Sequence, residues 1–141
     1  MNKRIKDKTK DIEKYIEQSS LIKPKTFKEY KGDFKTKAAC ERYFEKIAEA
    51  VIDLAFLVMK DRSLPIPEEE HQIFDVLEGE EIINSDLAKR LKDMKGMRNV
   101  IAHQYAEVND EIMFIAITEE LENDVTLFLT AVRKSDKKRD S

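Results

Sequence analysis

The segment GMRNVIAHQY, Gly96 to Tyr105, brings together side chains that could act on a phosphate group. Arg98 carries a permanent positive charge on a planar fork of donors, which matches phosphate oxygens. His103 can accept or donate a proton near neutral pH. Together they provide the parts for metal-independent phosphodiester cleavage. The arginine would hold the phosphate and stabilise developing charge, while the histidine moves protons.

The spacing of these residues limits how they can meet. Each residue of a helix turns by about 100°, so Asn99 and His103 share a face, as do Arg98 and Tyr105. Arg98 and His103 are five residues apart and point about 140° away from each other. They can converge on one phosphate only if the helix unwinds near Ala102, or if two copies of the chain meet across a two-fold axis. The local geometry favours a dimeric site.

A simpler structural explanation also fits these residues. Arg98 and His103 at the C-terminal end of a helix would offset the helix dipole, which stabilises a helix by about 0.3–1 kcal/mol for each exposed cation. Because such residues often occur at helix ends by chance, their types alone do not establish a site.

The segment from Gly96 to Tyr105 must be positioned by the rest of the fold, and the composition predicts that this fold is all-α. The 141 residues include three glycines and three prolines, too few for the turns of a many-stranded sandwich or barrel. Charged residues make up 39%, well above the usual quarter or so, and suit long helices with solvated outer faces. We expect a small antiparallel bundle of about four to five helices. It forms a single domain over residues 1–135, followed by a flexible basic tail at residues 136–141.

Hydrophobic periodicity places these helices along the chain. The strongest pattern predicts a helix over residues 36–60, in which Val51–Met59 is apolar nearly all round and therefore buried on more than one side. Gly96 lies inside the helix that carries the motif, at a cost of about 1 kcal/mol that a close backbone approach could offset. The other helices are expected over about residues 3–19, from Thr26, over residues 71–77, over about residues 86–103, and from about Asn109. The last of these would bury Ile117, Leu121, Val125, Phe128 and Val132.

The charge balance excludes a protein that binds nucleic acid through an overall basic surface. The chain has 26 basic and 29 acidic residues and a net charge of −3, so any RNA or DNA site must be local or formed by assembly. Residues 61–81 hold eight acidic residues and one basic residue, Arg62. We interpret this acidic segment as a solvated outer face.

Metal and cofactor sites have little support. Two histidines and one cysteine leave few zinc ligands, and the sequence has no P-loop, no G-x-G-x-x-G motif and no calcium-loop spacing. We expect no metal and no cofactor. The single cysteine, Cys40, excludes an intramolecular disulfide, fits a reducing cytosol and is expected in the core. No apolar run approaches the roughly 18 residues of a membrane span, so we expect a cytoplasmic protein without a membrane partner.

The residues RNVIAHQY resemble the R-x4-H-x-Y motif of the HepT toxins, a branch of the HEPN superfamily of α-helical ribonucleases. Residues 26–55 are similar to the long second helix of that family, including its Glu-Ala pair at Glu49–Ala50. Residues 108–125, VNDEIMFIAITEELENDV, resemble its closing helix. The resemblance extends over about residues 3–133, and the trailing tyrosine makes it more specific than R-x4-H alone.

This resemblance implies a homodimer of helical bundles whose paired motifs form one cleft, and RNA cleavage without metal by Arg98 and His103. Asn99 would be a supporting polar group, and Glu49 would help to orient Arg98 or His103. The resemblance also implies an antitoxin partner, a minimal nucleotidyltransferase of the MntA kind, which transfers AMP from ATP onto Tyr105 and inactivates the nuclease. Added phosphates beside the cleft would repel an RNA backbone and occupy its site.

Three hypotheses follow, from different classes of protein. The first is the toxin of a toxin–antitoxin system, a metal-independent endoribonuclease that an antitoxin neutralises by AMPylation. The alternative is a non-catalytic helical module that binds nucleotide or substrate for a partner nucleotidyltransferase, which needs the same fold but no proton transfer. In a purely structural bundle, Arg98 and His103 would tolerate alanine without functional loss.

Overall fold

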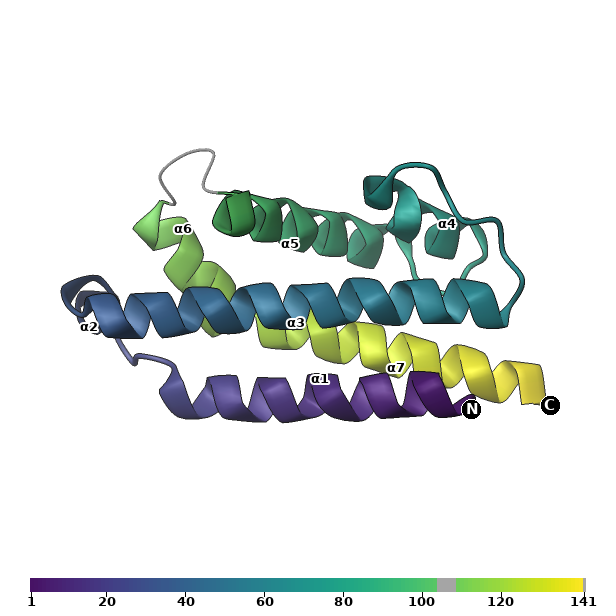
Figure 1. Cartoon of the computed structure of the whole chain (residues 1–141), viewed down its shortest axis with the longest axis horizontal. Helices are drawn as coiled ribbons and strands as arrows, with labels where there is room; N and C mark the ends of the chain where they lie inside the picture. The colour runs from purple at the N-terminus through teal and green to yellow at the C-terminus, as the bar shows by residue number, and fades with distance from the viewer. Residues whose placement is uncertain (104–108, 141) are drawn as a thin grey trace.

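The computed structural model describes residues 1–103 and 109–140, which form helices joined by short connections (Figure 1). In chain order the helices are α1 (Lys3–Ile22), α2 (Phe27–Gly32), α3 (Phe34–Asp61), the 3-10 turn η1 (Glu70–Gln72), α4 (Ile73–Gly79), α5 (Ser85–His103), α6 (Asp110–Ile115), the π-helical turn η2 (Ala116–Glu120) and α7 (Leu121–Asp140). The predicted all-α antiparallel bundle is confirmed.

The central element is α3, a helix of 28 residues that packs against α1, α4, α5 and α7. Its Val51–Met59 stretch was expected to be buried on more than one side, and six of these nine side chains are buried, namely Val51, Ile52, Leu54, Ala55, Val58 and Met59. Cys40 on the same helix lies in the core, as predicted. Every other long helix is therefore positioned by its contact with α3.

Local capping explains where the first helices begin and end. The Thr26 hydroxyl accepts a hydrogen bond of 3.1 Å from the Glu29 amide, which starts α2 as the sequence predicts. Asp33 then accepts a hydrogen bond of 3.0 Å from the Lys35 amide and starts α3 directly after Gly32. The chain therefore reverses direction within residues 23–34, and α1 and α3 lie side by side and antiparallel (Figure 1).

The motif helix α5 lies on the far side of α3 from α1, and α7 runs beside α1 and α3 (Figure 1). The five side chains predicted as the buried stripe of the final helix are all buried. Figure 1 places both termini at one end of the bundle and α2 and α6 at the other. The motif helix points its C-terminal end toward the α2–α6 end.

The C-terminal residues differ from their predicted form. The sequence predicts a flexible tail from residue 136, whereas α7 continues to Asp140. Ion pairs accompany this extension, because the N-terminal amino group lies 3.3 Å from Asp136 and Arg139 lies 2.5 Å from Asp61. These contacts join residues that are far apart in the chain, so periodicity alone could not reveal them. Within the described residues, no helix combines the length and the apolar character needed to cross a membrane.

Gly96 also differs from the expectation of a close backbone approach. A Cβ atom placed there would have no neighbour within 4 Å among the described residues, and the position is exposed. We therefore predict that Gly96→Ala raises the free energy of unfolding by about 1 kcal/mol, because alanine is the better helix former. Chemical denaturation of the purified protein measures this change. A fall in stability would indicate that another molecule packs against Gly96.

Candidate active site on the α5 helix

The helix that carries the motif is firmly anchored at its N-terminal end. The Asn84 side chain accepts a hydrogen bond of 2.8 Å from the Leu87 amide, which caps the first turn. Leu87, Leu91 and Met94 share one face of the helix and are buried in the core. The second half of α5 carries Arg98, Asn99 and His103 and is less buried. The core therefore fixes one half of the helix and leaves the other half accessible.

The helix continues without a break through Ala102 to His103. Arg98 and His103 therefore keep the separation of about 140° that a regular helix imposes. The two residues could converge on one phosphate if the helix unwound near Ala102, but α5 is helical there. The other arrangement from the sequence analysis, in which two copies of the chain meet, is compatible with this helix.

The Arg98 guanidinium lies against an acidic residue from another element. Its Nη2 donates a hydrogen bond to Glu70 Oε1 in η1, and only 16% of the Arg98 side chain is exposed. Lys95, which is buried, places its Nζ 3.8 Å from the same carboxylate oxygen. One carboxylate thus faces two cations that lie one turn apart on α5. Glu70 belongs to the acidic segment at residues 61–81, which we interpreted from the sequence as a solvated outer face. Through Glu70, this segment borders the candidate site.

Arg98 also keeps one donor unused. Its Nε is buried and has no hydrogen-bond partner among the described residues. A buried donor without a partner costs about 1–3 kcal/mol. Carboxylates and phosphates can both accept from two guanidinium nitrogens at once. Glu70 accepts from Nη2, and an anion reaches Nε only if the Arg98 side chain moves.

The other predicted site residues lie around this helix. His103 is exposed at the last position of α5, where a cation also opposes the helix dipole. Asn99 is half-buried on α5 and Glu49 is half-buried on α3. The carboxylate that pairs with Arg98 belongs to Glu70, so an orienting role for Glu49 stays a prediction. Tyr105 lies outside the described residues.

Sequence reasoning missed Glu70 and Lys95. Lys95 had a usable signal, because it precedes Arg98 by three residues and therefore shares its helix face. Glu70 had none, since eight acidic residues occur in its segment and nothing in their order singles it out. No group of three or more histidine, cysteine, aspartate or glutamate side chains in the described part of the chain could hold a metal ion.

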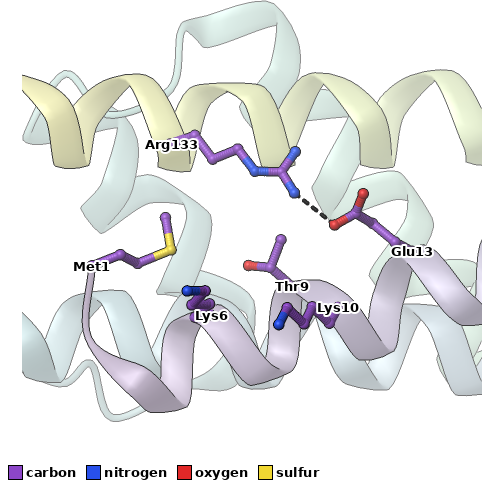
Figure 2. Close-up of a pocket in the computed structure, with 6 residues that line it drawn as sticks. All are labelled: Met1, Lys6, Thr9, Lys10, Glu13 and Arg133. Atoms are coloured by element: carbon purple, nitrogen blue, oxygen red, sulfur yellow. Dashed lines mark hydrogen bonds and ion pairs between the residues drawn. The ribbon is translucent and has the colours of Figure 1, made fainter.

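A separate hollow of about 280 Å³ lies between α1 and α7, near the termini. Arg133 of α7 and Glu13 of α1 form an ion pair of 2.6 Å at this hollow. Figure 2 shows the two side chains pointing toward each other, with Lys6 and Lys10 on the same helix as Glu13. The hollow contains none of the motif residues, and it lies toward the end of the bundle opposite His103. We therefore do not assign it to the candidate site.

Known proteins resemble this chain over most of its length. Residues 5–132 match the family described as ribonuclease HepT-like. The mRNA nuclease HepT of Shewanella oneidensis is 30% identical over 95 residues, which are 67% of this chain and 71% of that protein.

Solved structures agree with this match. A tri-AMPylated Shewanella oneidensis HEPN toxin in complex with an MNT antitoxin superposes with a TM-score of 0.87 and 27% identity, covering 95% of this chain and 99% of that one. A toxin–antitoxin crystal structure with AMP-PNP gives a TM-score of 0.85 and 26% identity, covering 94% and 99%. With its motif helix, its bundle and these matches, the chain belongs to the ribonuclease HepT-like family.

Proposed function

We propose that this protein is the toxin of a toxin–antitoxin pair and cleaves RNA without a metal ion, in a cleft formed by two copies of the chain. The observation that carries the proposal is the regular α5 helix, which presents Arg98 and His103 to different sides. Support comes from the family match and from relatives described as an mRNA nuclease and as a toxin bound to its antitoxin.

The proposed reaction uses the RNA's own 2′-hydroxyl as the nucleophile. Its oxygen attacks the adjacent phosphorus, and the bond from phosphorus to the 5′ oxygen of the next nucleotide breaks. His103 removes the proton from the 2′-hydroxyl and returns a proton to the leaving 5′ oxygen. Arg98 neutralises the charge that develops on the phosphate oxygens through its guanidinium group.

A second copy of the chain supplies what one copy lacks. A two-fold axis near the ends of two α5 helices brings two arginines and two histidines into one cleft. Val100, between Arg98 and His103 on α5, is only partly buried and does not pack against the core, whereas Met97 and Ile101 do. The apolar side chain of Val100 favours a contact between copies along the motif helix.

We further propose that a nucleotidyltransferase antitoxin inactivates the cleft by transferring AMP onto Tyr105. The tyrosine follows His103 by two residues, so phosphates attached there would lie beside the cleft and repel the RNA backbone. The AMPylated toxin bound to an antitoxin supports this role. We place the pair in the cytoplasm, where a reduced, buried Cys40 is expected to persist.

A ribonuclease assay in EDTA tests the proposed function. We expect the unmodified protein, verified by intact mass, to cleave single-stranded RNA. His103→Ala should reduce cleavage at least about 100-fold, because general acid–base catalysis contributes about that much or more. A sample AMPylated at Tyr105 should also be inactive.

The control in this assay is the oligomeric state and helical content of each variant, measured by sedimentation and circular dichroism. A folded His103→Ala dimer that cleaves as fast as the unmodified protein would remove His103 from the mechanism. If the unmodified, folded protein cleaves none of several RNAs, the non-catalytic binding module becomes the better interpretation.

The Glu70 contact generates a second prediction. Because Glu70 occupies Arg98 and Lys95, RNA must compete with it for both cations. Glu70→Gln should therefore bind a 2′-O-methyl RNA, which cannot be cleaved by this route, about fivefold more tightly, as expected for loss of a partly exposed ion pair worth about 1 kcal/mol. Fluorescence anisotropy measures the dissociation constant.

Glu69→Gln is the matched control, since it removes the same charge from an exposed neighbouring position. Equal affinities of the two variants would mean that any gain comes from overall charge and that Glu70 does not compete with RNA at Arg98.

A further inference from the structure

The turn between α1 and α3 concentrates positive charge. Residues 23–37, which we call the α2 corner, contain two acidic residues, Glu29 and Asp33, against six lysines. These are Lys23, Lys25, Lys28, Lys31, Lys35 and Lys37. The corner therefore carries a local excess of four positive charges on a chain whose net charge is −3. A local site of this kind is what the charge balance requires of a nucleic-acid binder.

Most of these lysines are not neutralised by neighbours. Lys23 pairs with Glu122 and Lys37 with Asp110, each at 2.9 Å. The other four, Lys25, Lys28, Lys31 and Lys35, are exposed and make no ion pair with the described residues. Their ammonium groups are available to an anionic partner.

The two acidic residues of the corner act as local structural groups. Glu29 Oε2 accepts a hydrogen bond of 3.1 Å from the Lys25 amide. Asp33 accepts from the Thr36 hydroxyl and from the Lys35 amide, each at 3.0 Å, and these bonds lower the pKa of its carboxyl group. Both carboxylates thus accept from backbone amides or a hydroxyl group, and within the described residues neither makes an ion pair with the four exposed lysines.

The other basic stretch of the chain behaves differently. At the end of α7, Arg133 lies 2.6 Å from Glu13 and Arg139 lies 2.5 Å from Asp61. Two of the five basic residues at this end of α7 are thus held by acidic residues of α1 and α3. Both regions are basic, and the α2 corner has the larger number of exposed lysines without an ion pair among the described residues.

An aromatic ring stands among the exposed lysines. Phe34 is 79% exposed, although it is a large apolar side chain. Its neighbours Phe27 and Tyr30 pack their rings against Phe114, with centroids 5.7 Å apart in both cases. Phe34 takes no part in that cluster. Many proteins that bind single-stranded nucleic acid combine exposed aromatic rings with basic residues. The bases stack on the rings, and the phosphates interact with the positive charges.

The corner lies at the end of the bundle toward which α5 points. Figure 1 places α2 beside α6, at the end opposite the termini. The Lys37–Asp110 pair and the Phe27–Phe114 contact join the corner to α6. A hollow of about 560 Å³, lined by Lys28, Gly32 and Asp33 among others, opens beside α2. The acidic segment around η1 and α4 lies at the other end (Figure 1).

We propose that the α2 corner binds the single-stranded RNA that enters the cleft, with the four exposed lysines on its phosphates and Phe34 stacked on a base. The inference rests on the proposed function and extends it from the cleavage residues to the surface that supplies affinity. RNA fits better than an acidic protein surface, because the exposed ring has no role in pairing with carboxylates, whereas every base offers a face for stacking.

The experiment compares three variants of the full chain, with a fluorescent 2′-O-methyl single-stranded RNA as the probe. The corner variant carries Lys25→Gln, Lys28→Gln, Lys31→Gln and Lys35→Gln. Its matched control carries Lys3→Gln, Lys6→Gln, Lys10→Gln and Lys14→Gln, the same charge change at exposed positions of α1. The third variant, Phe34→Leu, keeps an apolar side chain and removes the ring.

The corner variant should lower the slope of log affinity against log salt by about three, since each lost single-strand phosphate contact contributes about 0.7. The α1 control should leave most of that slope in place. Phe34→Leu should weaken binding about tenfold with the salt slope unchanged, as expected for one lost stacking contact.

Equal losses in the corner variant and the α1 control would overturn the proposal, because affinity would then follow total charge. A corner variant that binds RNA normally but no longer binds the antitoxin would assign the surface to the antitoxin instead. In either case, cleavage of RNA by the unmodified protein would leave the proposed function standing. An unmodified protein that neither binds nor cleaves RNA would remove both.

Discussion

The helical period is the constraint on which the rest of this structure depends. A straight helix turns about 100° per residue, so two side chains five positions apart cannot reach one small group. Arg98 and His103 are placed in this way on an unbroken α5. The fold supports that geometry, since Leu87, Leu91 and Met94 fix the first half of the helix in the core. In the proposed function, a site that uses both residues therefore comes from two copies of the chain.

In the proposed function, the uneven distribution of charge allows a protein with a net negative charge to bind RNA. Its charges are distributed unevenly along the bundle, with an acidic segment at residues 61–81 and a basic corner at residues 23–37. Glu70 from the acidic segment holds Arg98 and Lys95. The corner, at the other end, keeps four lysines exposed. In the proposed function, the corner attracts the RNA, and the RNA phosphate then competes with Glu70 for the guanidinium.

Local sequence patterns predicted the elements of the fold well. The spacing of apolar residues located α3 and α5 to within about two residues at either end, and the helix expected from Thr26 begins with Thr26 as its cap. The buried stripe from Ile117 to Val132, on η2 and α7, and the buried Cys40 also follow from periodicity. These features depend on residues that are neighbours in sequence, which is why a single sequence reveals them.

Features that depend on distant residues were not predictable in the same way. The helical C-terminal residues pair with Asp61 and with the N-terminal amino group, and no local pattern encodes those contacts. The open space at Gly96 and the pairing of Glu70 with Arg98 likewise depend on how helices pack. The motif residues could be selected from sequence, but their electrostatic environment could not.

The most direct test of the account uses a dimer that carries one Arg98→Ala copy and one His103→Ala copy, purified through two different affinity tags. Such a heterodimer keeps one arginine and one histidine, each on a different chain. The account predicts that it cleaves RNA in EDTA while both mutant homodimers are inactive. A heterodimer as inactive as the two homodimers, beside an active unmodified dimer with the same tags, would show that each chain needs its own pair and would contradict the shared cleft.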